Sequence, residues 1–307
     1  ILSIAIALLL ISIYLFIPNR IHISEDAEVP ASRDALLRKL GDDSCWYKWW
    51  PDKKAADSGT GIFSLNDVQY KIADKKTLSL SLNVSNKDLN ILTDLTFIAE
   101  NTENTTISFN EIIPTSYNPV KRIQRFLIAN KIKKGVPQLL QSIKSYHSNT
   151  FSLYGYDIQK KLVVDSTLLS TAKEIKGYPS TAIVYSLIDE LKNYIQQQAA
   201  TETGYPMLNI FTKDSITYLV KVAIPVNKKL SSSGNISYRW MLGGGNILIT
   251  EVKGDNKEIQ KAYTQIQHYI SDYKRIAPAI PFESLVTDRR KQPDSSQWVT
   301  KIYYPVM

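Results

Sequence analysis

The sequence has few of the residues that build common metal, redox and nucleophilic sites. It contains one cysteine, Cys45, and three scattered histidines, His22, His147 and His268. A single thiol excludes an internal disulfide framework, and neither residue type has metal-ligand spacing. We therefore expect no metal and no cofactor. Cys45 stands among aromatic residues, which favours a buried, unreactive thiol over a nucleophile.

The chain also lacks the signatures of phosphate binding, serine hydrolysis and nucleic-acid recognition. The triple-glycine run at residues 243–245 precedes a strand-like segment, so it lacks the helix N-terminus that a phosphate loop needs. No Gly-x-Ser-x-Gly elbow, zinc finger or helix-turn-helix is present. The net charge of +8 is spread over both halves, as 18 basic minus 15 acidic residues in 1–150 and 19 minus 14 in 151–307. We expect no nucleic-acid partner.

The sequence does contain one long uncharged run, at residues 1–17. As a helix it would span about 25 Å, close to the thickness of a hydrocarbon core. No small-x-small cleavage site follows it, which favours an uncleaved anchor over a signal peptide. The sequence thus predicts a single-pass N-terminal membrane anchor, with membrane lipid as a partner.

Residues 20–150 are expected to form a first soluble domain. A short strand and a helix are followed by a meander of four or five strands with alternating polarity, and then by a long helix from about Pro119 to Tyr146. Gly135 and Pro137 predict a break or kink in that helix. This order, with the string CWYKWWP after the first helix, resembles the SRPBCC superfamily of START-like and polyketide cyclase domains. The resemblance implies a helix-grip fold, an antiparallel sheet around the long helix, with a cavity that is either open to a ligand or filled.

Residues 163–307 contain an internal repeat. The closing string WVTKIYYPV (298–306) matches YLVKVAIPV (218–226), and EVKG (251–254) matches EIKG (174–177). Each copy places an amphipathic helical pattern after one strand and before two. We therefore expect a duplicated β-α-β-β unit of about 75 residues. Two such units would form one antiparallel sheet with both helices on one face and a groove on the other.

The strings EVKGDNKEIQKAYTQIQHYI, PFESLVTD and WVTKIYYPV resemble the GyrI-like domain, which is also the effector-binding domain of AraC-type and MerR-type regulators. The resemblance covers residues 163–307 and implies small-molecule binding, with the glutamate of PFES, Glu283, meeting polar or cationic ligands in the pocket. The fold class is therefore α+β, a helix-grip domain followed by a duplicated β-α-β-β domain.

The repeat singles out Glu283 independently, because the equivalent residue of the first copy is Leu208. A carboxylate on an apolar strand needs a partner when it is buried. That partner is either a ligand or a neighbouring tyrosine or lysine, such as Lys301. Strand parity places Tyr303 on the groove face and Tyr304 under the helices. The other aromatic residues expected near the groove are Tyr205, Trp240 and Phe282.

Aromatic rings around one carboxylate suit planar, lipophilic and often cationic ligands. The sequence therefore predicts a membrane-anchored small-molecule-binding protein rather than an enzyme. Two alternatives stay open. The first is a hydrolase of strained electrophilic molecules that uses Glu283 as its base. The second is a structural protein whose cavities are filled by its own side chains.

Overall fold

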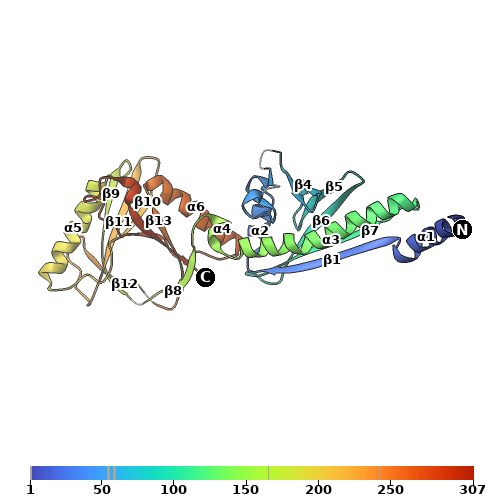
Figure 1. Ribbon diagram of the computed structural model, residues 1–307. Coiled ribbons are helices and arrows are strands. Elements are labelled where there is room, and N and C mark those ends of the chain that lie inside the picture. Colours follow the sequence, from blue (N-terminus) through green and yellow to red (C-terminus); the bar gives the residue numbers. More distant parts are fainter. Residues whose placement is uncertain (1, 54–55, 58–59, 165, 242) are drawn as a thin grey trace. The chain divides into compact units, whose positions relative to one another are not determined.

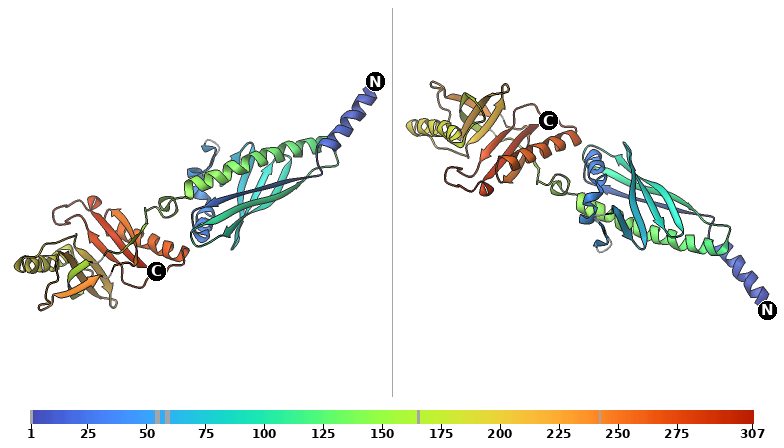
Figure 2. Two further views of the ribbon diagram at one scale, coloured as in Figure 1. Left: turned by 90° about the horizontal axis from the view of Figure 1, so that it is seen from below. Right: turned by 90° about the horizontal axis from the view of Figure 1, so that it is seen from above.

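The structure is a computed structural model that describes residues 2–53, 56–57, 60–164, 166–241 and 243–307. The chain divides into two compact units, Ile1–Leu153 and Tyr154–Met307 (Figures 1 and 2). Each unit is built on an antiparallel sheet with helices on one side, so the α+β class expected from the sequence is confirmed. The domain bounds inferred from the sequence, 20–150 and 163–307, stay a prediction.

The first unit holds a seven-stranded antiparallel sheet in the order β1-β7-β6-β5-β4-β3-β2. Its strands are β1 (Arg20–Val29), β2 (Ala56–Asp57), β3 (Ile62–Leu65), β4 (Val68–Lys75), β5 (Ser79–Asn86), β6 (Leu89–Ala99) and β7 (Thr105–Pro114). Its helices are α1 (Leu2–Phe16), α2 (Arg33–Leu40), the 3₁₀ turn η1 (Asp43–Lys48) and α3 (Pro119–His147), and the short helix α4 (Thr150–Tyr154) ends at the first residue of the second unit.

Helix α3 lies along the sheet and forms the long helix of the expected helix-grip arrangement (Figure 2). It begins where the Asn118 side chain accepts hydrogen bonds from two backbone N–H groups, with Pro119 at the first helical position. The helix continues through Pro137, so the predicted break at this point is absent. A side chain at Gly135 would be crowded, because a Cβ atom would lie 3.2 Å from Asn66 Nδ2 and 3.3 Å from Leu65 Cδ2.

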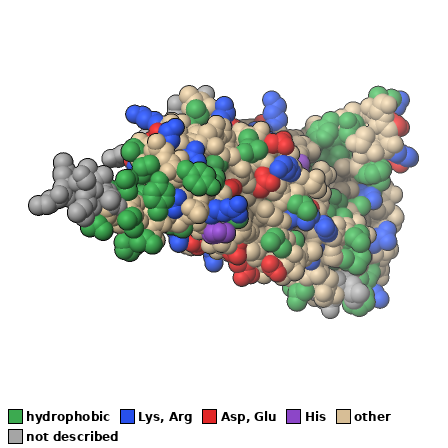
Figure 3. Space-filling model, turned by 90° about the vertical axis from the view of Figure 1, so that its right-hand side faces the viewer, with side chains coloured by type: hydrophobic (Ala, Val, Ile, Leu, Met, Phe, Trp, Pro, Cys, Tyr) green, Lys and Arg blue, Asp and Glu red, His purple; other side chains and the backbone are tan. Residues whose placement is uncertain are grey.

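The prediction of a membrane anchor over residues 1–17 is wrong. Helix α1 has 15 residues, about 22 Å of helix, and no helix in the described part of the chain is long and apolar enough to cross a membrane. It ends before Pro18, where the guanidinium of Arg122 donates to the Ile17 carbonyl and lies 4.8 Å from the Tyr14 ring. Figure 3 shows a group of hydrophobic side chains at the left of the face that it presents. The predicted lipid partner loses its support with the anchor, and residue 1 lies outside the described residues.

Aromatic side chains fill the end of the first unit where η1 meets the sheet. Trp50 is 1% exposed, and its ring centroid lies 5.6 Å from that of Trp46 and 5.3 Å from that of Phe63. The indole N–H of Trp50 donates to the Ser64 carbonyl at 2.8 Å. The CWYKWWP string is therefore a packing element. Cys45 within it is half-buried, which corrects the fully buried position expected from the sequence.

His147, the last residue of α3, is buried in the same region. Its ring lies 6.1 Å from that of Trp49 and 5.0 Å from that of Tyr146. Neither ring nitrogen has a hydrogen-bond partner in the described part of the chain. Burial, with a smaller contribution from Lys39, lowers the pKa of His147 from 6.5 to about 4. The imidazole is therefore neutral in the folded protein at neutral pH.

This burial predicts a pH-dependent loss of stability in the first unit. The stabilisation linked to neutral His147 is complete above pH 6.5 and falls as the pH drops toward 4, because the unfolded chain gains the proton first. The expected loss is about 3 kcal/mol. Urea unfolding of the parent and of His147→Phe at pH 7 and pH 4.5 measures it. An equal pH dependence in the two proteins would contradict the prediction.

The second unit holds an eight-stranded antiparallel sheet in the order β12-β9-β11-β10-β14-β15-β13-β8. The strands are β8 (Gln159–Leu162), β9 (Ser166–Lys176), β10 (Met207–Thr212), β11 (Thr217–Val226), β12 (Ser237–Met241), β13 (Asn246–Lys253), β14 (Phe282–Leu285) and β15 (Val299–Val306). The helices are α5 (Thr181–Gln197), α6 (Asn256–Asp272) and the 3₁₀ turn η3 (Ser295–Gln297).

The strand order of this sheet confirms the duplication. Copy one is β9-α5-β10-β11 and copy two is β13-α6-β14-β15. From one edge of the sheet to the centre the order is β12-β9-β11-β10, and from the other edge it is β8-β13-β15-β14, so equivalent strands hold equivalent positions. The copies meet at β10 and β14, where the equivalent residues Leu208 and Glu283 lie directly opposite each other. Two short outer strands were missed by the sequence analysis. Strand β8 precedes copy one in the sequence but pairs with β13 of copy two. Strand β12 precedes copy two but pairs with β9 of copy one.

The core of copy one lies between α5 and the sheet. It is aliphatic, and its central members include Ile188 from α5, Leu208 from β10, and Val220, Val222 and Ile224 from β11, all at most 2% exposed. Helix α5 turns this face inward because its apolar residues recur every three or four positions after the Ser180 N-cap. Copy one therefore packs as a filled half-domain.

Candidate functional site

The site predicted from the sequence is divided between the two faces of the second sheet. Glu283 on β14 opposes Leu208 and Ile302, both of which lie under the helices, so its side chain shares that face. Its neighbour Phe282 pairs with Tyr303 on the opposite face. The expectation that Glu283 and Tyr303 line one groove is therefore wrong, because residues paired across two strands point to the same face and successive residues to opposite faces.

The predicted aromatic residues lie on the face away from the helices or at its edge. Phe282 and Tyr303 stack with centroids 4.9 Å apart and planes 4° apart. Together with Tyr205 they line a cavity of about 350 Å³ on this open face. Trp240 lies on the edge strand β12, where 62% of it is exposed, and it lines neither this cavity nor the one beside Glu283.

Glu283 lines a larger cavity, of about 830 Å³, on the helix face. Four tyrosines surround this cavity as two ring pairs. Tyr178 and Tyr218 come from copy one and have centroids 5.6 Å apart, whereas Tyr263 on α6 and Tyr304 on β15 have centroids 6.4 Å apart. The sequence analysis assigned none of these tyrosines to the site. We call this space the Glu283 cavity.

The repeat explains why the space under α6 is polar, whereas the equivalent space under α5 is a filled aliphatic core. At four equivalent positions, buried aliphatic residues of copy one are replaced by polar residues in copy two. Three of the replacements line the cavity, and the fourth, Thr300, accepts a hydrogen bond from Arg289, which contacts Glu283. The replacements are Ile188 by Tyr263, Leu208 by Glu283, Val220 by Thr300 and Ile224 by Tyr304. The same comparison of copies singled out Glu283, so this signal in the sequence could also have found Tyr263 and Tyr304, although not the two tyrosines of copy one.

The partner of Glu283 is Arg289, from the loop between β14 and β15, and not Lys301, which pairs with Glu251. Arg289 Nη2 lies 3.4 Å from Glu283 Oε2 and donates to Thr300 Oγ1 at 3.1 Å. Burial raises the pKa of the Glu283 carboxyl, and the nearby guanidinium opposes that rise. At 3.4 Å the contact is longer than a strong charge-assisted hydrogen bond.

The charge of Glu283 also affects the phenols around it. Burial raises the pKa of Tyr263, and the coulombic effect of Glu283 adds to the rise. The pKa of Tyr178 is raised for the same two reasons, in the same order. Both tyrosines therefore keep their O–H groups at neutral pH and remain hydrogen-bond donors facing a carboxylate-bearing cavity.

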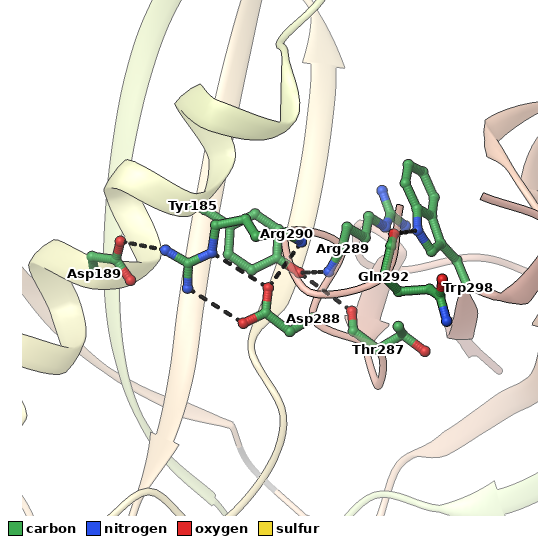
Figure 4. A network of polar contacts seen from close by, with 8 residues as sticks. All are labelled: Tyr185, Asp189, Thr287, Asp288, Arg289, Arg290, Gln292 and Trp298. Atoms are coloured by element: carbon green, nitrogen blue, oxygen red, sulfur yellow. Dashed lines mark hydrogen bonds and ion pairs between the residues drawn. The ribbon is translucent and has the colours of Figure 1, made fainter. Parts of the chain in front are cut away.

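The loop that carries Arg289 is held against α5 by the contacts drawn in Figure 4. Tyr185 accepts a hydrogen bond from the Arg289 backbone N–H at 2.7 Å and donates to the Thr287 carbonyl at 3.3 Å. Arg290 lies 4.4 Å from the Tyr185 ring and forms a 2.7 Å ion pair with Asp189. A loop of copy two is thus fixed by a helix of copy one, which positions Arg289 beside Glu283.

No protein-family model matches the chain, and no curated protein matches it either. Solved structures with a similar fold include the EcmrR C-terminal domain, which is 18% identical, with 50% of this chain and 98% of that one covered and a TM-score of 0.43. Another is SAV2435 bound to tetraphenylphosphonium, at 15% identity, 49% and 93% coverage and a TM-score of 0.33. A third is the Zhui aromatase/cyclase from Streptomyces sp. R1128, at 9% identity, 41% and 92% coverage and a TM-score of 0.31. At these identities the likeness concerns the fold alone.

Proposed function

We propose that the second unit binds a small aromatic molecule in the Glu283 cavity and that the molecule presents a positive charge or a hydrogen-bond donor to the carboxylate. The observation that carries this proposal is the set of four aliphatic-to-polar replacements in copy two. A side chain that serves packing alone would follow copy one, in which the same positions form a filled core. A cavity of about 830 Å³ also lies within the size range of ordinary ligand pockets.

The contacts of Glu283 leave room for a ligand. Arg289 approaches one carboxylate oxygen, Oε2, at the long distance of 3.4 Å. A carboxylate has about four acceptor positions, so it can accept a further hydrogen bond without losing this one. The rings of Tyr178, Tyr218, Tyr263 and Tyr304 provide faces for stacking and for attraction to a cation.

Tetraphenylphosphonium is a suitable first probe, because it is an aromatic cation without any other functional group. We expect it to raise the melting temperature of the full chain by mass action. Glu283→Gln is expected to weaken its binding by about 1 to 3 kcal/mol, the scale of a contact with a charged group. Isothermal titration calorimetry measures the change.

The control for this experiment is Glu174→Gln on β9, which removes the same charge from an exposed ion pair with Lys213. Its binding should match that of the parent protein. The proposal is wrong if no aromatic cation or hydrogen-bond donor raises the melting temperature, or if both variants lose affinity equally.

A second candidate function, hydrolysis of a strained electrophile, rests on one observation. The raised pKa of Glu283 moves its carboxyl toward the range in which a general base acts near neutral pH. In this case the protein would consume an electrophilic ligand over time, and Glu283→Gln would stop the consumption. Mass spectrometry of the ligand after incubation separates the two functions, because a binding protein returns its ligand unchanged.

A further inference from the structure

The open face of the second sheet contains a cavity that shares one lining residue, Asn209, with the Glu283 cavity. It measures about 450 Å³ and lies over copy one. Its floor is made of small side chains on three neighbouring strands: Ala172 and Ser170 on β9, Ala223 on β11 and Ser237 on β12. Ser170 pairs with Ala223 on one side and with Ser237 on the other. We call it the open-face cavity.

Large apolar side chains form the walls of the open-face cavity. Met207 and Phe282 are equivalent residues of the two copies, and both also line the smaller cavity beside Tyr303. Ala223 is the residue of copy one that corresponds to Tyr303. In copy two, Tyr303 stacks on Phe282 and covers the sheet, whereas Ala223 leaves the matching space open.

The charged residues around this space are all positive. Lys221 and Arg239 line the open-face cavity, Lys161 lines the adjoining one, and no carboxylate is among the lining residues of either. Within the described part of the chain, Lys221 and Arg239 form no ion pair. This face differs from the Glu283 cavity, in which a carboxylate is buried.

A hydrogen-bond acceptor also lacks a partner in the wall. The Asn209 amide donates to the Pro281 carbonyl at 2.9 Å, but its Oδ1 atom is buried and accepts no hydrogen bond from any described residue. Asn209 pairs with Lys221 across β10 and β11, so its side chain lies on the open face. A buried acceptor without a partner costs about 1 to 3 kcal/mol, and a ligand N–H or O–H would remove that cost.

We propose that the open-face cavity is a second binding site, for a lipophilic anion such as an aromatic or long-chain carboxylate or sulfonate. The apolar body lies between Met207 and Phe282, over the floor formed by Ala223. Arg239 binds the acidic head group, because a guanidinium matches a carboxylate or sulfonate through two parallel hydrogen bonds. Lys221 stands at the other end of the floor and adds positive potential.

The probes are 8-anilinonaphthalene-1-sulfonate and its neutral counterpart N-phenyl-1-naphthylamine, which lacks the sulfonate. Both are titrated by fluorescence against the full chain. Arg239→Gln is expected to weaken binding of the sulfonate about five- to tenfold and to change the affinity for the neutral amine less than twofold. Ala223→Tyr, which copies Tyr303 of copy two, is expected to weaken both probes more than tenfold by filling the space.

Two controls isolate the site. Lys173→Gln removes a positive charge from the helix face of β9 and should leave both affinities unchanged. Saturating tetraphenylphosphonium, the probe of the Glu283 cavity, should not displace the sulfonate, so this proposal and the proposed function succeed or fail separately. Circular dichroism verifies that each variant is folded. Failure of the sulfonate to bind, or binding that is insensitive to both Arg239→Gln and Ala223→Tyr, would overturn the proposal.

Discussion

Replacing Arg289 with methionine is expected to lower the free energy of unfolding of the second unit by about 3 to 5 kcal/mol. The Arg289 and Glu283 side chains are only 9% and 12% exposed, so removal of the guanidinium leaves a desolvated carboxyl without its cation. Thr300 Oγ1 loses a donor at the same time. Methionine keeps most of the apolar contact that Arg289 makes with the Trp298 ring, 4.9 Å away. Chemical denaturation followed by circular dichroism measures the loss.

The pH dependence of the Arg289→Met variant provides a second readout. Without the guanidinium, burial alone acts on Glu283, so its folded-state pKa rises further above the unfolded value of 4.5. The variant should therefore be most stable at low pH and lose stability as the pH rises through the folded-state pKa. The double variant Arg289→Met with Glu283→Leu restores the leucine that copy one has at this position, and it should recover most of the loss. No recovery in the double variant would refute the pairing.

Replacing Trp50 with alanine is expected to cost the first unit about 3 to 5 kcal/mol, the range for large aromatic residues in cores. Trp50 is 1% exposed, stacks on Trp46, packs against the tilted ring of Phe63, and donates its indole N–H to the Ser64 carbonyl. Truncation therefore leaves a cavity and an unpaired carbonyl together. The unfolding transition of the first unit should move to lower denaturant, while that of the second unit stays in place.

Trp240→Ala is the matched control for Trp50→Ala. The same atoms are removed from a side chain that is 62% exposed on the edge strand β12, so the free energy of unfolding should change by no more than about 0.5 kcal/mol. If both tryptophan variants lose the same stability, the aromatic cluster does not hold the first unit together.

The duplication was the part of the fold that the sequence predicted best. Strings that recur after about 75 residues located both helices and six of the eight strands of the second sheet, because hydrophobic periodicity marks long amphipathic elements. The two strands that were missed, β8 and β12, are short and largely exposed, so they carry no apolar pattern. Each of these strands pairs with the other copy, and no short stretch of the sequence indicates that pairing, because it forms only when the two copies pack together.

The error about Glu283 had a different cause. Parity within one strand correctly separated Tyr303 from Tyr304, but the face of Glu283 depends on which residue of β15 it opposes. A register shift of one residue would have placed Glu283 beside Tyr303. The alternation of side chains along a single strand does not determine the register between two strands. The register of β14 against its neighbours was decided by the packing of Ile302 and Leu208 under the helices.

By itself, the sequence determined the α+β class, the repeat, and Glu283 as the position where copy two departs from an apolar strand. Those properties depend on residue order along the chain. The tertiary structure alone decided that no helix in the described part of the chain is long and apolar enough to cross a membrane, that Arg289 pairs with Glu283, and that tyrosines rather than Phe282 and Tyr303 surround the carboxylate. These properties depend on where helices end and on contacts between distant segments, which form only when the chain packs and buried charges find partners.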